Sequence, residues 1–147
     1  MHSAETMVKS LFNAFPQRVA RETVAPHECQ ECWALRDKLT GVTWQDVSGD
    51  FVNANDGALP LLSQEAYVAY LPAWLHQAVL DPNGPAAGMV LINLHDKPDV
   101  SGFTRCQAKV IMEVARFIVR SSIWGLDDPG NIESLAEIER VWSSVKA

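Results

Sequence analysis

The chain contains 147 residues, of which 48% are hydrophobic and 20% charged, a balance that excludes a disordered protein and suits one globular domain. Its 12 basic and 18 acidic residues leave a net charge of −6, which argues against general nucleic-acid binding and against recruitment to anionic membranes. No apolar run approaches the roughly 18 residues of a transmembrane helix, and the N-terminus lacks the pattern of a secretory signal. We therefore expect a cytoplasmic protein.

The first half of the chain contains three segments with recognisable local patterns. Apolar residues three and four positions apart predict helices over residues 4–15 and about 28–39, which Pro16 and Gly41 end. Residues 42–57 are rich in Gly, Asn and Asp, and this composition predicts a loop. That loop would pass three apolar residues over the core: Trp44, Val47 and Phe51.

A third helix is predicted over residues 64–80, with Ser63 as its N-cap and Glu65 in its first turn. Pro72 interrupts this pattern, because a proline ring clashes with the preceding helical turn and removes one hydrogen bond. Either the helix kinks at Pro72, or a new helix begins there with the proline in its first turn.

The second half predicts a turn-rich break over residues 81–88 and two further helices. The apolar run MVLINL predicts one short strand or hairpin near residues 88–95, with a short helical turn as the alternative. Thr104 is the expected N-cap of a helix over residues 105–124, and residues 132–145 form a final amphipathic helix. Together these patterns predict an all-α protein whose residues 1–147 form one domain of five to six helices.

His27, Cys29 and Cys32 form the sharpest local motif, His-Glu-Cys-Gln-Glu-Cys. A Cys-x-x-Cys pair with a histidine two residues upstream can direct three ligands at one zinc ion. A structural zinc needs a fourth ligand from elsewhere in the fold: Cys106, His76, His95 or an acidic side chain. Zinc is thus the one cofactor that the sequence suggests.

Two other interpretations of these cysteines stay open. Cys29 would lie in the first turn of the predicted second helix, where the helix dipole lowers a thiol pKa and favours redox chemistry. However, the βαβ context of a thioredoxin-like site is missing, and Glu28 and Glu31 oppose a thiolate. In the simpler interpretation, Cys32 faces the core and Cys29 has no particular role.

Charge is distributed unevenly along the chain. Residues 50–99 contain six acids and one base, Lys97, which gives −5; the acids are Asp50, Asp56, Glu65, Asp81, Asp96 and Asp99. The predicted helix over residues 105–124 carries a basic stripe that could contact a phosphate or an acidic partner: Arg105, Lys109, Arg116 and Arg120. Alternatively the stripe is a solvated helix face. Glu113 lies within it, can pair with Lys109, and reduces the net charge of the stripe to +3.

The two charged regions allow two arrangements. They could face each other within the molecule, or the acidic region could form an exposed face for a basic protein partner. Catalytic signatures are sparse, because the sequence contains no Gly-rich phosphate loop and no Gly-x-Ser-x-Gly turn. His95 and Asp96 are adjacent in a predicted loop, and neighbouring residues rarely form an acid–base pair.

Two segments and one later residue carry a resemblance to known sequences. The first is Glu-Cys-x-x-Leu-Arg at residues 31–36, preceded by His27 and Cys29 and followed by Trp44; the second is LLSQEAYVAYLPAWL at residues 61–75. Together with Gln107 they resemble an uncharacterised bacterial family of small soluble proteins, a domain of unknown function, over roughly residues 27–124. The resemblance implies a bacterial cytoplasmic protein and transfers no catalytic residue. The Leu-Pro helix is also similar, over a short stretch, to some immunity proteins.

Three functional hypotheses follow from the sequence. The leading one is a non-enzymatic protein-binding or regulatory module that acts like an immunity or accessory protein. The alternatives are a zinc-binding protein centred on His27, Cys29 and Cys32, and a small enzyme or thiol redox protein. The sequence does not define an oligomeric state.

Overall fold

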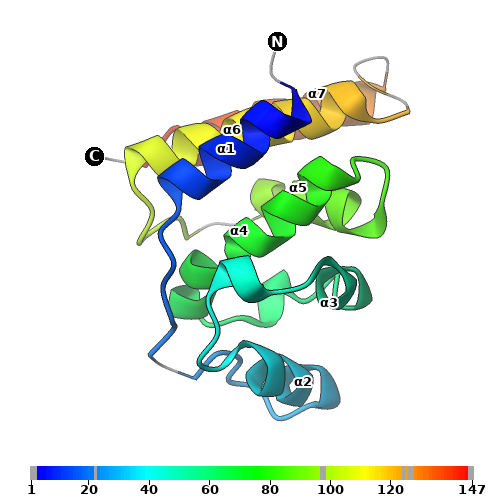
Figure 1. Cartoon of the computed structure of the whole chain (residues 1–147). Helices are drawn as coiled ribbons and strands as arrows, with labels where there is room; N and C mark the ends of the chain where they lie inside the picture. The colour runs from blue at the N-terminus through cyan, green and yellow to red at the C-terminus, as the bar shows by residue number, and fades with distance from the viewer. Residues whose placement is uncertain (1–2, 22, 97–98, 124, 126–127, 146–147) are drawn as a thin grey trace.

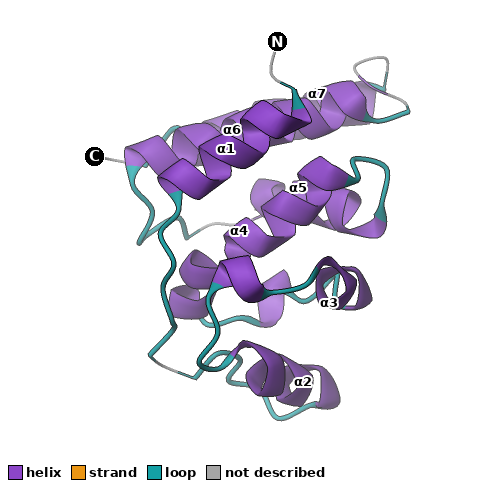
Figure 2. Ribbon diagram, in the orientation of Figure 1, coloured by secondary structure: helices purple, strands orange, loops and turns teal. Residues whose placement is uncertain are grey.

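The computed structural model of the chain describes residues 3–21, 23–96, 99–123, 125 and 128–145. These residues form an all-α fold without a strand (Figures 1 and 2), with seven α-helices and two short 3-10 helices, η1 and η2. The elements are α1 (Ala4–Ala14), α2 (Gln30–Leu39), η1 (Trp44–Asp46), α3 (Gly49–Ala54), η2 (Leu59–Leu61), α4 (Gln64–Leu80), α5 (Pro85–Asp96), α6 (Arg105–Ser121) and α7 (Pro129–Trp142). The all-α prediction is confirmed, with α3 and α5 raising the helix number above six.

The helices surround α4, which packs against α1, α3, α5 and α6. On one side, α1, α6 and α7 lie together as a layer; on the other, α2 and α3 lie at the far end of the molecule (Figure 1). Within the described residues, none of the helices combines the length and hydrophobicity needed to cross a bilayer.

The central helix α4 is apolar around most of its circumference, and twelve of its 17 residues are buried. Ser63 caps it by accepting a hydrogen bond from the Ala66 backbone N–H at 3.2 Å, as the sequence predicts. The helix continues through Pro72, so no new helix begins there. Pro72 is itself buried, in agreement with the apolar character of α4 on most sides.

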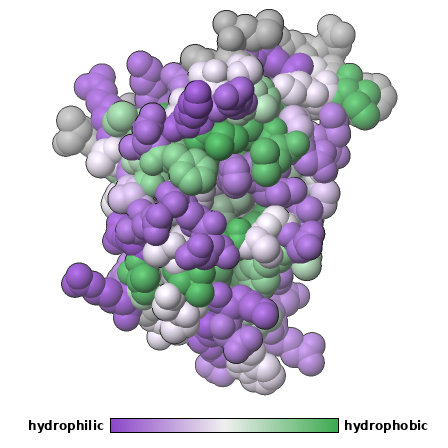
Figure 3. Space-filling view, viewed as in Figure 1, coloured by the Kyte–Doolittle hydropathy of each residue, from purple (hydrophilic) through white to green (hydrophobic). Residues whose placement is uncertain are grey.

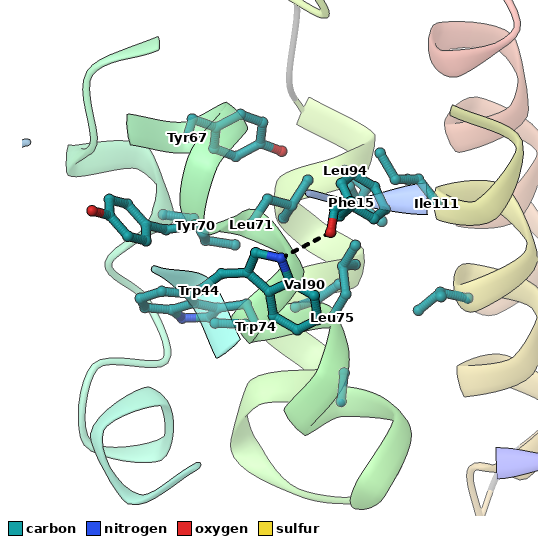
Figure 4. Packing of buried hydrophobic residues seen from close by; sticks show 14 of the residues in the cluster. Phe15, Trp44, Tyr67, Tyr70, Leu71, Trp74, Leu75, Val90, Leu94 and Ile111 are labelled. Carbon is teal, nitrogen blue, oxygen red and sulfur yellow. Dashed lines mark hydrogen bonds between the residues drawn. The ribbon is translucent and has the colours of Figure 1, made fainter. Parts of the chain in front are cut away.

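Three aromatic residues of α4, whose side chains are drawn in Figure 4, use their polar tips to attach other segments to the core. Tyr67 donates a hydrogen bond to the Asn93 side chain at 2.6 Å, and Trp74 donates one to the Asn55 carbonyl at 3.2 Å. The Tyr70 hydroxyl is shared between the Leu39 and Val42 carbonyls, each at 2.7 Å. Burial raises the pKa of the Tyr67 hydroxyl, so the group remains a neutral donor. The large side chains of residues 61–75 therefore build the core and hold neighbouring segments against it.

The strand or hairpin predicted near residues 88–95 is wrong, because this segment is helical in α5. Its buried residues have helical spacing and face α4 and α7: Ala86, Ala87, Val90 and Leu94. Gly88 lies on the exposed side, where it does not interrupt packing. The neighbouring helices thus bury one face of a segment whose local composition favours a break.

The loop predicted over residues 42–57 also contains regular structure, namely η1 and α3. Ser48 caps α3 by accepting from the Phe51 backbone N–H at 3.1 Å. Trp44 is buried, and its indole donates to the Phe15 carbonyl at 3.2 Å (Figure 4). The segment therefore passes Trp44 over the core as expected, but through short helical turns.

The helix α6 is the amphipathic helix that the sequence predicts, three residues shorter at its C-terminal end. Its N-terminus carries a reciprocal capping box between Thr104 and Gln107. The Gln107 amide also donates to the Ala14 carbonyl at 3.1 Å, which ties α6 to the end of α1. In α7, Ile138 and Trp142 are buried, as the periodicity predicts.

Candidate functional site

The predicted metal ligands His27, Cys29 and Cys32 lie at the N-terminus of α2, but in different environments. His27 is exposed, Cys29 is half-buried and Cys32 is completely buried. Burial raises the pKa of the Cys32 thiol, and the nearby Cys29 thiol adds to this shift. In the described part of the chain, no three His, Cys, Asp or Glu side chains are grouped to hold a metal ion. The structure does not test zinc binding itself, which stays a prediction.

Cys29 occupies the N-cap position of α2, immediately before the first turn in which the sequence placed it. Its Sγ accepts a hydrogen bond from the Cys32 backbone N–H at 3.3 Å. Arg36 supports the same segment by donating to the Ala25 and His27 carbonyls at 2.6 and 3.2 Å. Cys32 faces the core, so the geometry gives each cysteine a structural task.

A substitution at Cys29 separates the capping role from a zinc-binding role. Serine is among the best N-cap residues and sulfur is a weak acceptor, so we expect Cys29→Ser to preserve or raise the free energy of unfolding. Cys29→Ala should lower it by about 0.5–1 kcal/mol. Urea unfolding measures both variants. Stoichiometric zinc in untagged protein, with a large loss of stability in Cys29→Ser and on chelation, would contradict the capping role and support a zinc site.

The basic stripe of α6 divides into three parts in the structure. Arg116 lies against α7, and its Nε donates to Glu139 Oε1 at 2.9 Å. Arg105 and Lys109 are exposed beside a hollow between α6 and α7. Arg120 is exposed near the other end of the helix. The stripe therefore contains one residue in an ion pair and three exposed residues, and its contact with an anion or a partner stays a prediction.

None of the ion pairs among the described residues joins the acidic segment to the basic stripe. Glu65 instead accepts from the Arg21 backbone N–H, and Asp99 from the Ser101 backbone N–H at 2.9 Å. Asp50 and Asp81 are exposed. Of the two arrangements that the sequence allows, the observed contacts favour an acidic region that faces outward.

Part of this acidic region lines a groove made from segments far apart in the chain. One hollow, of about 260 Å³, lies between the η2 segment and α5, with Leu59, Pro60, Met89 and Ile92 on its walls. A second, of about 330 Å³, lies between α2 and the end of α3. Both hollows are lined by Asp56 and Gly57. We call the two together the acidic groove.

Three carboxylates lie along the acidic groove: Glu31 from α2, Asp56 after α3, and Asp96 at the end of α5. No Lys, Arg or His is among the described residues that line it. Asp56 makes no hydrogen bond or ion pair with the described part of the molecule. Ile92 is 56% exposed. The groove therefore combines negative charge with accessible apolar surface.

His95 and Asp96 are in contact, although neighbouring residues rarely form such a pair. They lie at the C-terminal end of α5, where His95 Nδ1 is 2.6 Å from Asp96 Oδ1. Among the described residues lining the adjoining hollow there is no Ser, Cys, Thr or Lys that this pair could activate. The pair therefore fits a role as a charged group at the edge of the hollow better than a role in activating a nucleophile.

An aromatic cluster of Phe12, Trp44 and His76 is a feature that sequence reasoning missed, because its members lie on α1, η1 and α4. The Phe12 ring centroid lies 5.0 Å from that of Trp44 and 5.8 Å from that of His76. Burial lowers the pKa of His76, so the neutral imidazole is the form that packs here. Apolar surface is visible below α1 in Figure 3, and Phe12 itself is 43% exposed.

Comparisons with known proteins do not define a family for this chain. No protein-family model, curated protein or solved structure matches it. The resemblance at residues 27–124 therefore stays a prediction.

Proposed function

We propose that this protein is a non-enzymatic regulatory module of the bacterial cytoplasm that binds a basic protein partner through the acidic groove. The observation that carries the proposal is the set of three carboxylates beside exposed apolar walls, with no basic side chain among the described lining residues. A binding site for a positively charged segment needs both features, because opposite charge guides the encounter and apolar burial stabilises the complex.

The shape of the acidic groove defines the chemistry of the partner segment. The hollow beside Met89 and Ile92 suits one apolar side chain, which would act as an anchor. Lysine or arginine residues on either side of that anchor would meet Glu31, Asp56 and Asp96. Asp56 has no ion-pair partner among the described residues, so binding need not break an ion pair with any of them.

Gly57 provides a way to block the groove without touching its charges. A Cβ atom added at Gly57 would lie 3.4 Å from Met89 Cε, and the Gly57 backbone does not have a positive φ that would strain another residue. Gly57→Leu should therefore fold normally and fill the groove. We expect it to weaken partner binding at least about tenfold, because the apolar anchor can no longer enter.

The experiment is affinity capture from a lysate of the source organism, followed by titration of the purified captured protein. The charge variant combines Glu31→Gln, Asp56→Asn and Asp96→Asn, and we expect it to bind at least about fivefold more weakly and with less salt dependence. The matched control combines Glu5→Gln, Asp37→Asn and Glu133→Gln, which remove the same charge from exposed positions elsewhere.

The proposal requires a basic partner that the control triple variant retains and the groove variants lose. Capture of a protein that all variants bind equally would contradict it, as would an acidic partner. Circular dichroism and melting temperature check that each variant is folded before the titrations are compared.

A further inference from the structure

A third hollow lies between α6 and α7, and its charged lining residues are basic, in contrast to those of the acidic groove. The two helices pack side by side and run in opposite directions, so the start of α6 and the end of α7 meet there (Figure 1). The hollow has a volume of about 500 Å³. Its walls come from Ala108 and Met112 on α6 and from Trp142 and Val145 at the end of α7.

Two charged residues line this hollow, Arg105 and Lys109, and both are basic. Arg105 and Lys109 line it one helical turn apart, and both are exposed. Neither has an ion-pair partner within the described residues, in contrast to Arg116 on the same helix. No carboxylate is among the described residues that line the hollow. A negative group placed between the two cations would therefore meet attraction from both.

We propose that this hollow binds an anionic amphiphile, a single alkyl chain that ends in a carboxylate. The alkyl chain would lie on the accessible apolar surface of the hollow beside Met112, with the buried Trp142 and Val145 behind it, and the carboxylate would lie between Arg105 and Lys109. The chain would replace water on that accessible apolar surface, and the carboxylate would accept hydrogen bonds from the two cations. The site is independent of the acidic groove, since no residue lines both.

The exposed thiol of Cys106 also lines this hollow and reports directly on its occupancy. The experiment measures the rate of Cys106 alkylation by iodoacetamide, resolved by peptide mass spectrometry, with decanoate as the probe below its micelle concentration. We expect decanoate to slow alkylation of Cys106 in a saturable manner. Cys29, which is half-buried on α2, is the internal control and should be unaffected.

Three comparisons test the chemistry of the ligand. Decanol and decylamine have the same chain without the negative charge, and both should bind more weakly than decanoate. Arg105→Gln and Lys109→Gln should each weaken decanoate binding about two- to fivefold, as expected for exposed ion pairs. Arg120→Gln is the matched control, because it removes the same charge from an exposed position of α6 that does not line the hollow.

The location is tested with Ser143→Trp, which fills the hollow from an exposed position and should abolish protection of Cys106. Equal protection by decanol, or equal weakening by Arg120→Gln, would overturn the charge assignment. Decanoate binding that survives Ser143→Trp would place the ligand elsewhere. Tighter binding of a short peptide with an apolar C-terminal residue and a free carboxylate would overturn the alkyl chain in favour of a peptide end.

Discussion

Replacing Trp142 by alanine should lower the free energy of unfolding by about 3–5 kcal/mol, the range found for large aromatic residues in protein cores. Trp142 is completely buried in α7, and its indole donates to the Leu94 carbonyl of α5 at 3.1 Å. Its ring also packs edge-on against Phe103 at 5.1 Å. The substitution removes the side chain that joins α7 to α5, leaving a cavity and an unpaired carbonyl.

Urea unfolding followed by far-UV circular dichroism measures this loss. Trp33 is the control, because it is 52% exposed on α2 and its indole bonds only to the exposed Glu28 side chain at 3.1 Å. Trp33→Ala should change the free energy of unfolding by less than about 1 kcal/mol. A similar small change for Trp142→Ala would mean that α7 is not docked on α5 as described.

Gln107→Ala should lower the free energy of unfolding by about 1–3 kcal/mol, because one side chain satisfies two backbone groups. Gln107 Oε1 accepts from the Thr104 backbone N–H at 2.9 Å, and its amide donates to the Ala14 carbonyl. Alanine leaves both groups without these partners at the junction of α1 and α6. The same unfolding experiment measures the effect.

Gln107→Glu separates the two contributions. A carboxylate can still accept from the Thr104 N–H and is favourable in the first turn of a helix, but it cannot donate to the Ala14 carbonyl. The carboxylate would also face the Ala14 carbonyl oxygen in a buried position, so we expect a loss at least as large as for alanine. If glutamate is as stable as the original glutamine, the link between α1 and α6 contributes nothing, and the capping box alone explains the role of Gln107.

The helices that the sequence predicts well are those that carry their own local signals. For α6, Thr104 begins the helix and the apolar residues repeat on one face over four turns, so its type does not depend on its neighbours. For α4, Ser63 predicts the start of the helix correctly, but the sequence pattern does not decide whether the helix continues past Pro72. In the structure, α4 continues through Pro72 and is buried on most sides.

The elements that the sequence missed depend on tertiary packing. In α5, Gly88 and the apolar run after it suggest a break and a strand, and only the contacts with α4 and α7 bury a helical face there. In α3, six residues are too few to give a periodic pattern. Its Ser48 cap was nevertheless present as a local signal.

The candidate sites also differ in whether local sequence or tertiary packing brings their residues together. Cys-x-x-Cys spacing brings His27, Cys29 and Cys32 close in sequence, but the start of α2 turns Cys32 into the core and leaves His27 exposed. In contrast, Glu31, Asp56 and Asp96 are up to 65 positions apart in sequence and still line adjoining hollows. No pattern of spacing could have predicted that neighbourhood.

The sequence by itself determined the helical class and the start of the strongest helices, because caps and apolar periodicity act within a few residues. It also determined the net charge of −6 and its division between an acidic segment and a basic stripe. Only the tertiary structure decided where those charges face. The packing of α5 against α4 carries Asp96 to the groove beside Asp56, and the pairing of α6 with α7 satisfies Arg116 while leaving Arg105 and Lys109 beside an apolar hollow.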